Sequence, residues 1–437
     1  MIRFNFIKNQ KKIFYNFSWL FFERILNFLI NIYLSVTIAY YFGPSDFGTI
    51  SFLNSVVAIL STFALLGLPA IIVRDIVVGC KPSVQTMGSA VALVIASSII
   101  TYIILILIVL NTALVNEVNK LLLLILSVKI LFNFCEIFIS WFEAKVLSKY
   151  VVWGRSIITI LFFFIKLYAV FYHTTLNILF IVMALETFVT SIFIILLMDR
   201  YGLKLYHLKL DINLAKTLFK DALPLLIGGL VILLHIRIDQ IMLQQMLGAK
   251  SVGIYSAGVK ISEALYFIPI ILSASVFPNI LRSKNISKEE YYKKLQKLFD
   301  ISFVMSLVLS IIIILSSGYI IQSLFGEEYQ DSASITAIHA FGLIFVSFGV
   351  ISGKWFIAEG LQIFSLQRNL FALIINVFLN YFLIPEFGII GAASTTIISQ
   401  AFACFIFDIL FKKTRIIFWM KCRSLNLMRY ANYRSAT

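Results

Sequence analysis

Twelve apolar segments, each long enough to cross a membrane as a helix, constrain the fold of this sequence more than any other feature. A spanning helix needs about 20 apolar residues, whereas a closed β-barrel alternates apolar and polar positions. Hydrophobic residues make up 61% of the 437-residue chain and charged residues 13%, which leaves no room for a large aqueous domain. The sequence therefore predicts an all-α integral membrane protein with twelve transmembrane helices, at about 13–41, 49–73, 84–109, 119–142, 151–172, 176–198, 219–243, 252–281, 300–322, 332–353, 362–384 and 389–411.

Basic residues are concentrated on one side of these predicted helices. Most of the 36 Lys and Arg residues lie near the termini and in the loops after even-numbered helices, whereas the opposite loops hold Lys120 and Lys250. Positive residues collect on the cytoplasmic side of short loops. Both termini are therefore predicted to be cytoplasmic, and the net charge of +15 reflects topology and bilayer lipids, with no nucleic-acid partner.

A weak internal repeat divides the predicted helices into two sets of six. GPSDFGTIS begins at Gly43 and GAKSVGIYS begins at Gly248, each in a loop that leads into the second helix of its set. Repeated halves of this kind are typical of alternating-access transporters, which handle substrate between the halves. We expect two pseudo-symmetric six-helix lobes with a basic cytoplasmic linker and tail, bounded as 1–198, 199–218, 219–411 and 412–437.

Polar and charged residues recur inside the predicted spans, where a charge costs about 2.5–3.5 kcal/mol unless it faces a cavity or a partner. Helical spacing places several of them on shared faces, as with Lys129, Asn133 and Glu136. One interpretation is internal ion pairing, of Lys129 with Glu136, Lys260 with Glu263, and Glu23 with a neighbour. The other is a substrate-binding central cavity, lined by Arg24, Asn27, Asn31, Lys129, Asn133, Lys166, Arg237 and Lys260.

Some of these charges have no partner one turn away on their own helix. Lys166 and Arg237 are the predicted spare cations, and Glu186 and Asp239 are the matching spare acids. A carboxyl group isolated in a low-dielectric site can carry a proton through a conformational cycle, although either acid could instead neutralise a cation on another helix. The candidates for proton or ion coupling are Glu186, Asp239, Glu136 and Glu263.

The sequence contains no pattern for a cofactor or a metal. Cys80, Cys135, Cys404 and Cys422 are scattered. His235 and His339 are expected to be hydrogen-bonded interior residues. Pro269 predicts a kink in the span at 252–281.

Four segments, in order along the chain, resemble one known family. They read YYFGPSDFGTISF, LGAKSVGIYSAGVKISEALYFIP, LFGEEYQDSASITAIHA and NVFLNYFLIPEFGIIGAASTTIIS. They are similar to the polysaccharide flippases (Wzx-type O-antigen transporters) of the multidrug/oligosaccharidyl-lipid/polysaccharide exporter superfamily. The resemblance implies a transporter in the bacterial inner membrane that moves an undecaprenyl-pyrophosphate-linked repeat unit to the periplasmic leaflet. It also implies other polysaccharide assembly proteins as partners, and no enzymatic activity.

Two alternatives remain open at this stage. A cation or drug antiporter of the same superfamily would share the fold but should present net acid to its substrate. An O-antigen polymerase would be equally hydrophobic, but such enzymes carry catalytic residues on a sizeable external loop, and the external connections predicted here are short.

Overall fold

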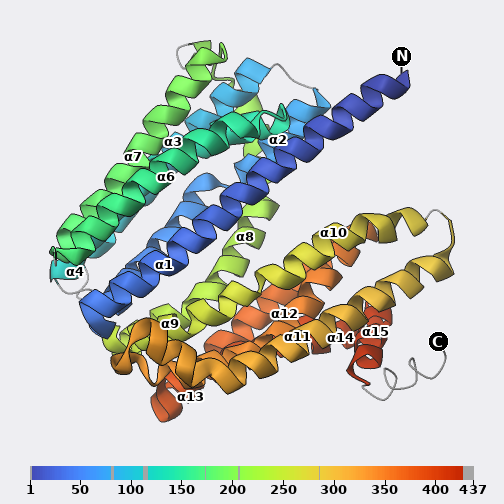
Figure 1. Ribbon diagram of the computed structural model, residues 1–437. Helices are drawn as coiled ribbons and strands as arrows, with labels where there is room; N and C mark the ends of the chain where they lie inside the picture. The colour runs from blue at the N-terminus through green and yellow to red at the C-terminus, as the bar shows by residue number, and fades with distance from the viewer. Residues whose placement is uncertain are drawn as a thin grey trace. The chain divides into compact units, whose positions relative to one another are not determined.

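The computed structural model of the protein describes residues 2–79, 83–111, 117–172, 174–204, 207–284 and 286–426. Every regular element in this part of the chain is a helix (Figure 1). Contacts divide the chain into two compact units, Met1–Leu233 and Leu234–Thr437. The lobe, linker and tail boundaries stay predictions. Cys80 lies outside the described residues.

Ten helical segments of the described chain are long and apolar enough to cross a membrane. Two of them, Ser18–Val78 and Gln362–Leu410, have 61 and 49 residues, far more than one span requires. Each contains a glycine outside the helical conformation, Gly43 with φ 74° and ψ 176° and Gly388 with φ 60° and ψ −135°. Glycine adopts such angles easily because it has no Cβ. With these two breaks, the ten segments contain the twelve predicted spans, and the protein is an all-α multi-pass membrane protein.

The first unit comprises seven helices and the first part of an eighth. They are α1 (Ile2–Leu65), α2 (Leu68–Val78), α3 (Ser83–Asn111), α4 (Glu117–Leu131), α5 (Cys135–Ala144), α6 (Ser148–Phe171), α7 (Leu176–Arg200) and α8 (Ile212–Leu247).

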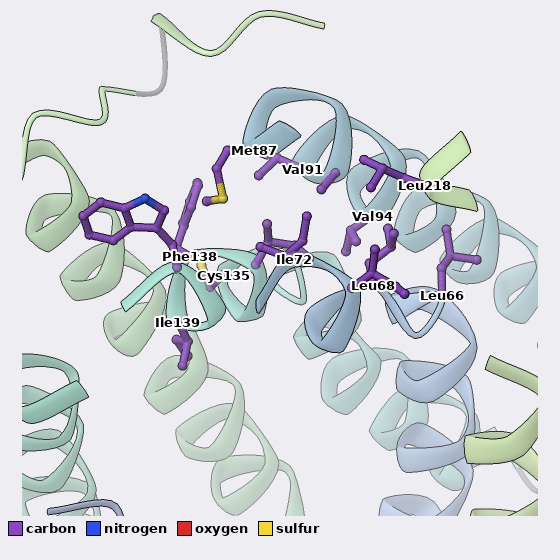
Figure 2. Close-up of a cluster of buried hydrophobic side chains, with 14 of the residues drawn as sticks. Leu66, Leu68, Ile72, Met87, Val91, Val94, Cys135, Phe138, Ile139 and Leu218 are labelled. Carbon is purple, nitrogen blue, oxygen red and sulfur yellow. The ribbon is translucent and has the colours of Figure 1, made fainter. Parts of the chain in front are cut away.

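A hydrophobic core joins six helices of this unit, α2, α3, α5, α6, α7 and α8, and Figure 2 shows part of it. Met87, Val91 and Val94 project from one face of α3, because residues three and four apart share a face of a helix. The other labelled side chains come from the region of α2, from α5 and from α8, and they are Leu66, Leu68, Ile72, Cys135, Phe138, Ile139 and Leu218. Their packing positions the short helix α5, which carries Glu136 and Glu143.

The second unit contains the rest of α8 and the remaining elements. They are α9 (Ala249–Leu265), α10 (Phe267–Ser283), α11 (Lys288–Phe325), η2 (Glu327–Tyr329), α12 (Ser332–Ala358), α13 (Gln362–Ala401), the π-helical turn η3 (Phe402–Ile406), α14 (Phe407–Leu410) and α15 (Arg415–Leu425). Its core is rich in aromatic residues, including Phe299, Phe348 and Trp355, and it also includes Ile417 and Met420 of α15.

The two copies of the sequence repeat share a backbone conformation. Gly43 and Gly248 both have positive φ with extended ψ, at 74° and 176° for Gly43 and 83° and 178° for Gly248. A helix follows each glycine directly. The short motif therefore marks the same kind of turn in both units.

Three predicted helices are interrupted. The predicted span at 49–73 breaks between α1 and α2, and the span at 252–281 breaks at Tyr266, three residues before Pro269. A proline ring clashes with the carbonyl groups of the preceding turn, so the kink falls before the proline itself. The predicted span at 119–142 tightens at Phe132–Phe134, where backbone hydrogen bonds join residues three apart. The spacing of Lys129 and Glu136 therefore does not follow one regular helix.

Candidate functional site

A buried carboxylate lies at the centre of a polar cluster in the second unit. Asp239 of α8 is 2% exposed. Tyr255 of α9 donates a hydrogen bond of 2.8 Å to its Oδ2 atom, and Asn380 of α13 donates one of 2.6 Å to its Oδ1 atom. The Thr396 hydroxyl also donates to Oδ2. We call these four residues the Asp239 cluster.

The break at Gly388 brings the two halves of α13 into this cluster. Asn380 precedes the break, whereas Thr395 and Thr396 follow it. Residues 380 and 395 would lie about 22 Å apart along a continuous helix, yet the Thr395 hydroxyl donates to Asn380 Oδ1. The chain therefore reverses direction at Gly388, so side chains from two successive spans meet around one carboxylate.

Two histidines border the cluster, and both are hydrogen-bonded as predicted. His339 of α12 is 2% exposed, and its Nε2 atom lies 3.3 Å from the Tyr255 hydroxyl. His235 Nε2 lies 3.0 Å from the Ser399 hydroxyl. Neither histidine forms an ion pair with Asp239 in the described part of the chain.

The charge of Asp239 is thus solvated by neutral donors and is not cancelled by a cationic side chain of the described residues. Three hydrogen bonds stabilise the ionised form, but an unneutralised charge remains costly where the membrane excludes water. A proton or a small cation would remove that cost. This environment is suited to reversible uptake of one positive charge.

In the first unit, the structure corrects the prediction that Lys166 and Glu186 are both spare. Lys166 of α6 is 8% exposed and forms an ion pair with Glu186 of the adjacent helix α7. Sequence spacing reveals partners on the same helix, but the partner of Lys166 lies on another helix. The prediction had left open that the acid might neutralise a cation elsewhere, and this is what the structure shows.

Lys129 of α4 supplies the excess positive charge beside this pair. It interacts electrostatically with both Lys166 and Glu186. No ion pair joins Lys129 to Glu136 in the described chain, because the tightened turn at Phe132–Phe134 separates them. A second ammonium group therefore lies near the Lys166–Glu186 pair in the membrane-spanning part of the first unit.

A second ionic group of the first unit is acidic. Glu23 of α1 contacts Arg155 of α6 at 3.3 Å, which confirms the expectation that Glu23 has a partner. Glu136 and Glu143 of α5 interact electrostatically with Glu23. This group therefore holds three carboxyl groups and one guanidinium group, and Glu23, Glu143 and Arg155 line a small cavity of about 30 Å³.

The remaining predicted cavity residues of the first unit have mostly backbone partners. Asn31 donates a hydrogen bond of 2.7 Å to the carbonyl of Asn27, one turn earlier in α1. Asn133 donates one of 3.3 Å to the carbonyl of Ser61, which ties the tightened turn to α1. Arg24 is exposed and forms no ion pair with any described residue.

In the second unit, Arg237, Lys260 and Glu263 form a looser group. Lys260 of α9 interacts electrostatically with Glu263 and with Arg237 of α8. The predicted ion pair of Lys260 with Glu263 does not form, and among the described residues Arg237 has no ion-pair partner either. This group also has one more cation than it has acids.

The family profile described as "Polysaccharide biosynthesis protein" matches residues 10–284, which is more than half of the chain. The chain belongs to the polysaccharide biosynthesis protein family. A second profile, MatE, matches residues 224–382.

Relatives of this polysaccharide biosynthesis protein cover almost all of its length. It is 25% identical over 409 residues to the capsular polysaccharide biosynthesis protein CapF of Staphylococcus aureus, covering 91% of this chain and 99% of CapF. Its fold is similar to that of the lipid II flippase MurJ in an inward closed conformation, with a TM-score of 0.69, 17% identity and coverage of 97% and 93% of the two chains. It also resembles an inward-facing multidrug resistance MATE transporter of the MOP superfamily, with a TM-score of 0.66, 16% identity and coverage of 92% and 95%. The predicted resemblance to this exporter superfamily and its fold is confirmed.

Several polar residues of this polysaccharide biosynthesis protein escaped the sequence analysis. Tyr255 and Thr396 have no periodic signal among so many polar and aromatic residues, although Asn376 and Asn380, one turn apart, mark a polar face of α13.

The pair of Lys421 and Asp408 was missed because residues 412–437 were predicted as a basic cytoplasmic tail, separate from the span at 389–411. Both side chains are fully buried in an ion pair that joins α15 to α14. Lys421 also donates a hydrogen bond of 2.6 Å to the carbonyl of Cys404. Burial lowers the pKa of Lys421, and Asp408 opposes that shift.

Proposed function

We propose that the protein is a flippase that moves an undecaprenyl-pyrophosphate-linked O-antigen or other polysaccharide repeat unit from the cytoplasmic to the periplasmic leaflet by alternating access. The family supports this function, as do the names of CapF and of the lipid II flippase MurJ. Each of these proteins is linked by its name to polysaccharide synthesis or to moving a lipid-linked precursor. The proposed role is transport without catalysis.

The observation that carries the proposal is a local excess of positive charge in one group of each unit, around Glu186 in the first and around Glu263 in the second. Lys129 adds a second ammonium group to the Lys166–Glu186 pair, and Arg237 joins Lys260 beside Glu263. A pyrophosphate that leaves water needs cationic partners, because its charge interacts strongly in a low dielectric. We therefore assign headgroup binding to these cations, with Arg24, Asn27, Asn31 and Asn133 as further contacts in a central cavity.

Ion coupling is assigned to the Asp239 cluster. Asp239 is buried and held by three neutral donors, so a proton or a monovalent cation bound there would neutralise it. Glu186 is a weaker candidate, because it is already paired with Lys166. Glu136 and Glu263 stay secondary candidates.

The proposed location is the bacterial inner membrane, with both termini in the cytoplasm. The concentration of basic residues near the termini and in the loops after even-numbered spans supports this orientation. The predicted partners are the lipid-linked oligosaccharide, bilayer lipids and other polysaccharide assembly proteins.

Complementation tests the proposal directly. The chain is expressed in bacteria that lack their own flippase but make the lipid-linked repeat unit, and the repeat unit is followed on each leaflet. The wild type should restore transfer to the periplasmic leaflet, whereas Lys129→Gln and Asp239→Asn should reduce it at equal expression. Lys250→Gln, an exposed charge outside both groups, is the matched control. If the wild type fails in several such hosts, or both variants transport normally, the assignment is wrong.

A cation or drug antiporter is the second candidate, because a buried acid with only neutral partners can also bind a cationic substrate. The fold of the MATE transporter supports this alternative. Drug resistance conferred by the wild type and lost in Asp239→Asn, with no transfer of lipid-linked saccharide, would favour it.

A further inference from the structure

An apolar groove of the first unit lies between α1 and α6, beside the group of Glu23, Glu143 and Arg155. It has a volume of about 560 Å³. We call it the α1–α6 groove, and it is lined by Ser18, Trp19, Phe22, Leu26, Val152, Trp153, Ser156, Ile157 and Ile160. Sites of roughly 300–1,000 Å³ hold one small organic molecule or part of a larger one.

The lining of the groove is apolar and aromatic. The rings of Trp19 and Trp153 come from different helices, and their centroids lie 5.5 Å apart. Phe22 is 50% exposed, Trp153 is 51% exposed and Ile157 is 58% exposed. The groove therefore presents large apolar side chains on the surface of the spanning segment, where lipid chains are the available partners.

One end of the groove carries a cation. Lys149, in the first turn of α6, lies with its Nζ atom 5.7 Å from the ring centroid of Trp19. Lys149 is exposed and forms no ion pair with any described residue. Tryptophan is enriched where a membrane meets water, so this end has the chemistry of the headgroup level. Lys149 would therefore match the phosphate of a lipid, and the apolar lining beyond Trp19 would match the chain attached to that phosphate.

The groove also adjoins the acidic group of the first unit. Val152 lines both the groove and the small polar cavity that contains Glu23, Glu143 and Arg155. Trp19 and Glu23 are four residues apart on α1, so the two sites lie beside the same stretch of the α1–α6 contact. A lipid bound in the groove would have its chain along the outer surface of α1 and α6. Its headgroup would lie near the small polar cavity that contains Glu23, Glu143 and Arg155.

We propose that the α1–α6 groove binds the phosphate-proximal part of a polyprenyl chain, with Lys149 contacting the phosphate. This inference rests on the proposed function, in which the substrate is carried on such a chain. A polyprenyl chain has a methyl branch in every unit and fills a wide groove better than a single straight acyl chain. Lys149 supplies the charge that matches a phosphate. The groove would keep the tail at the protein surface while the saccharide moves.

Photolabelling of the full-length protein tests the assignment. The protein is placed in nanodiscs of phosphatidylcholine and exposed to a polyprenyl phosphate that carries a photoreactive group in its first isoprene units. Labelled peptides should contain residues 18–26 and 149–160. Unlabelled polyprenyl phosphate should compete, whereas phosphatidylglycerol and inorganic pyrophosphate should not.

Two isoleucines of α6 provide a matched pair of variants. Ile160 lines the groove and is 39% exposed, whereas Ile165 does not line it and is 38% exposed. Ile160→Trp should lower labelling about tenfold, because the larger ring fills part of the groove. Ile165→Trp should leave labelling unchanged. Lys149→Gln should weaken labelling by the phosphate form but not by a polyprenol without phosphate.

The labelling results test whether the groove binds the polyprenyl chain, and complementation tests whether the protein is a flippase. Labelling outside the groove, equal competition by phosphatidylglycerol, or equal effects of Ile160→Trp and Ile165→Trp would overturn the groove assignment, even if the wild type complements a flippase-null strain. Groove-specific labelling by a protein that fails to complement would support the groove and count against the proposed flippase.

Discussion

The two units stabilise buried carboxylates in opposite ways. In the first unit Glu186 is neutralised by Lys166, and Lys129 adds a further charge beside the pair. In the second unit Asp239 receives three hydrogen bonds from neutral groups, with no cation paired to it among the described residues. An ion pair fixes charge in one state, whereas neutral donors leave a carboxylate free to bind and release a cation. This difference supports the proposal that the first cluster binds the headgroup and that the second one couples transport to an ion.

Breaking the ion pair of the first unit should have the largest effect on stability. Glu186→Gln leaves Lys166 buried without its counter-charge, which costs about 3–5 kcal/mol in buried pairs. The purified variant should unfold at a clearly lower temperature than the wild type. The double variant Lys166→Met/Glu186→Leu, which removes both charges, should recover most of the loss. If the single and double variants were equally unstable, packing and not charge would explain the result.

The second unit should be most sensitive to its backbone turn. Gly388→Ala forces a side chain into a left-handed conformation that costs about 1–3 kcal/mol, and it strains the reversal that brings Asn380 to Thr395. Thermal unfolding should show this loss. Gly318→Ala, in a helix and with open space around the added carbon, should be neutral or stabilising. A neutral Gly388→Ala would mean that the reversal does not need glycine.

Removing one neutral donor should cost less. Tyr255→Phe deletes the hydroxyl that donates to Asp239, so the free energy of unfolding should fall by about 1 kcal/mol. Ion-dependent transport should fall strongly, although the variant still folds. Tyr319→Phe, at a residue that is 79% exposed, is the control and should change neither. Unchanged ion dependence in Tyr255→Phe would argue against coupling at this cluster.

The smallest stability change is expected at Lys129. Its charge repels Lys166, so Lys129→Gln should change the free energy of unfolding by no more than about 1 kcal/mol, or raise it slightly. Transport of an anionic lipid-linked substrate should nevertheless fall. A variant that is fully active would contradict the role given to the surplus cation of the first unit.

Hydropathy predicted the spans well because continuous apolar runs depend only on local sequence. The breaks at Gly43 and Gly388 fall between predicted spans for the same reason. Pairing across helices was harder to predict. Glu186 was assigned as spare because Lys166 lies 20 residues away on the adjacent helix. Asp239 was recognised as lacking a cation, but its donors Tyr255 and Thr396 come from helices whose packing no periodicity reveals.

The buried pair of Asp408 and Lys421 has a consequence for biosynthesis. The acid is made before the lysine that neutralises it, because the lysine lies thirteen residues later in the chain. A polypeptide truncated between these positions would keep Asp408 but would lack Lys421 and at least the end of α15. Such a copy should be less stable than the full chain, because its buried carboxylate would have no counter-charge.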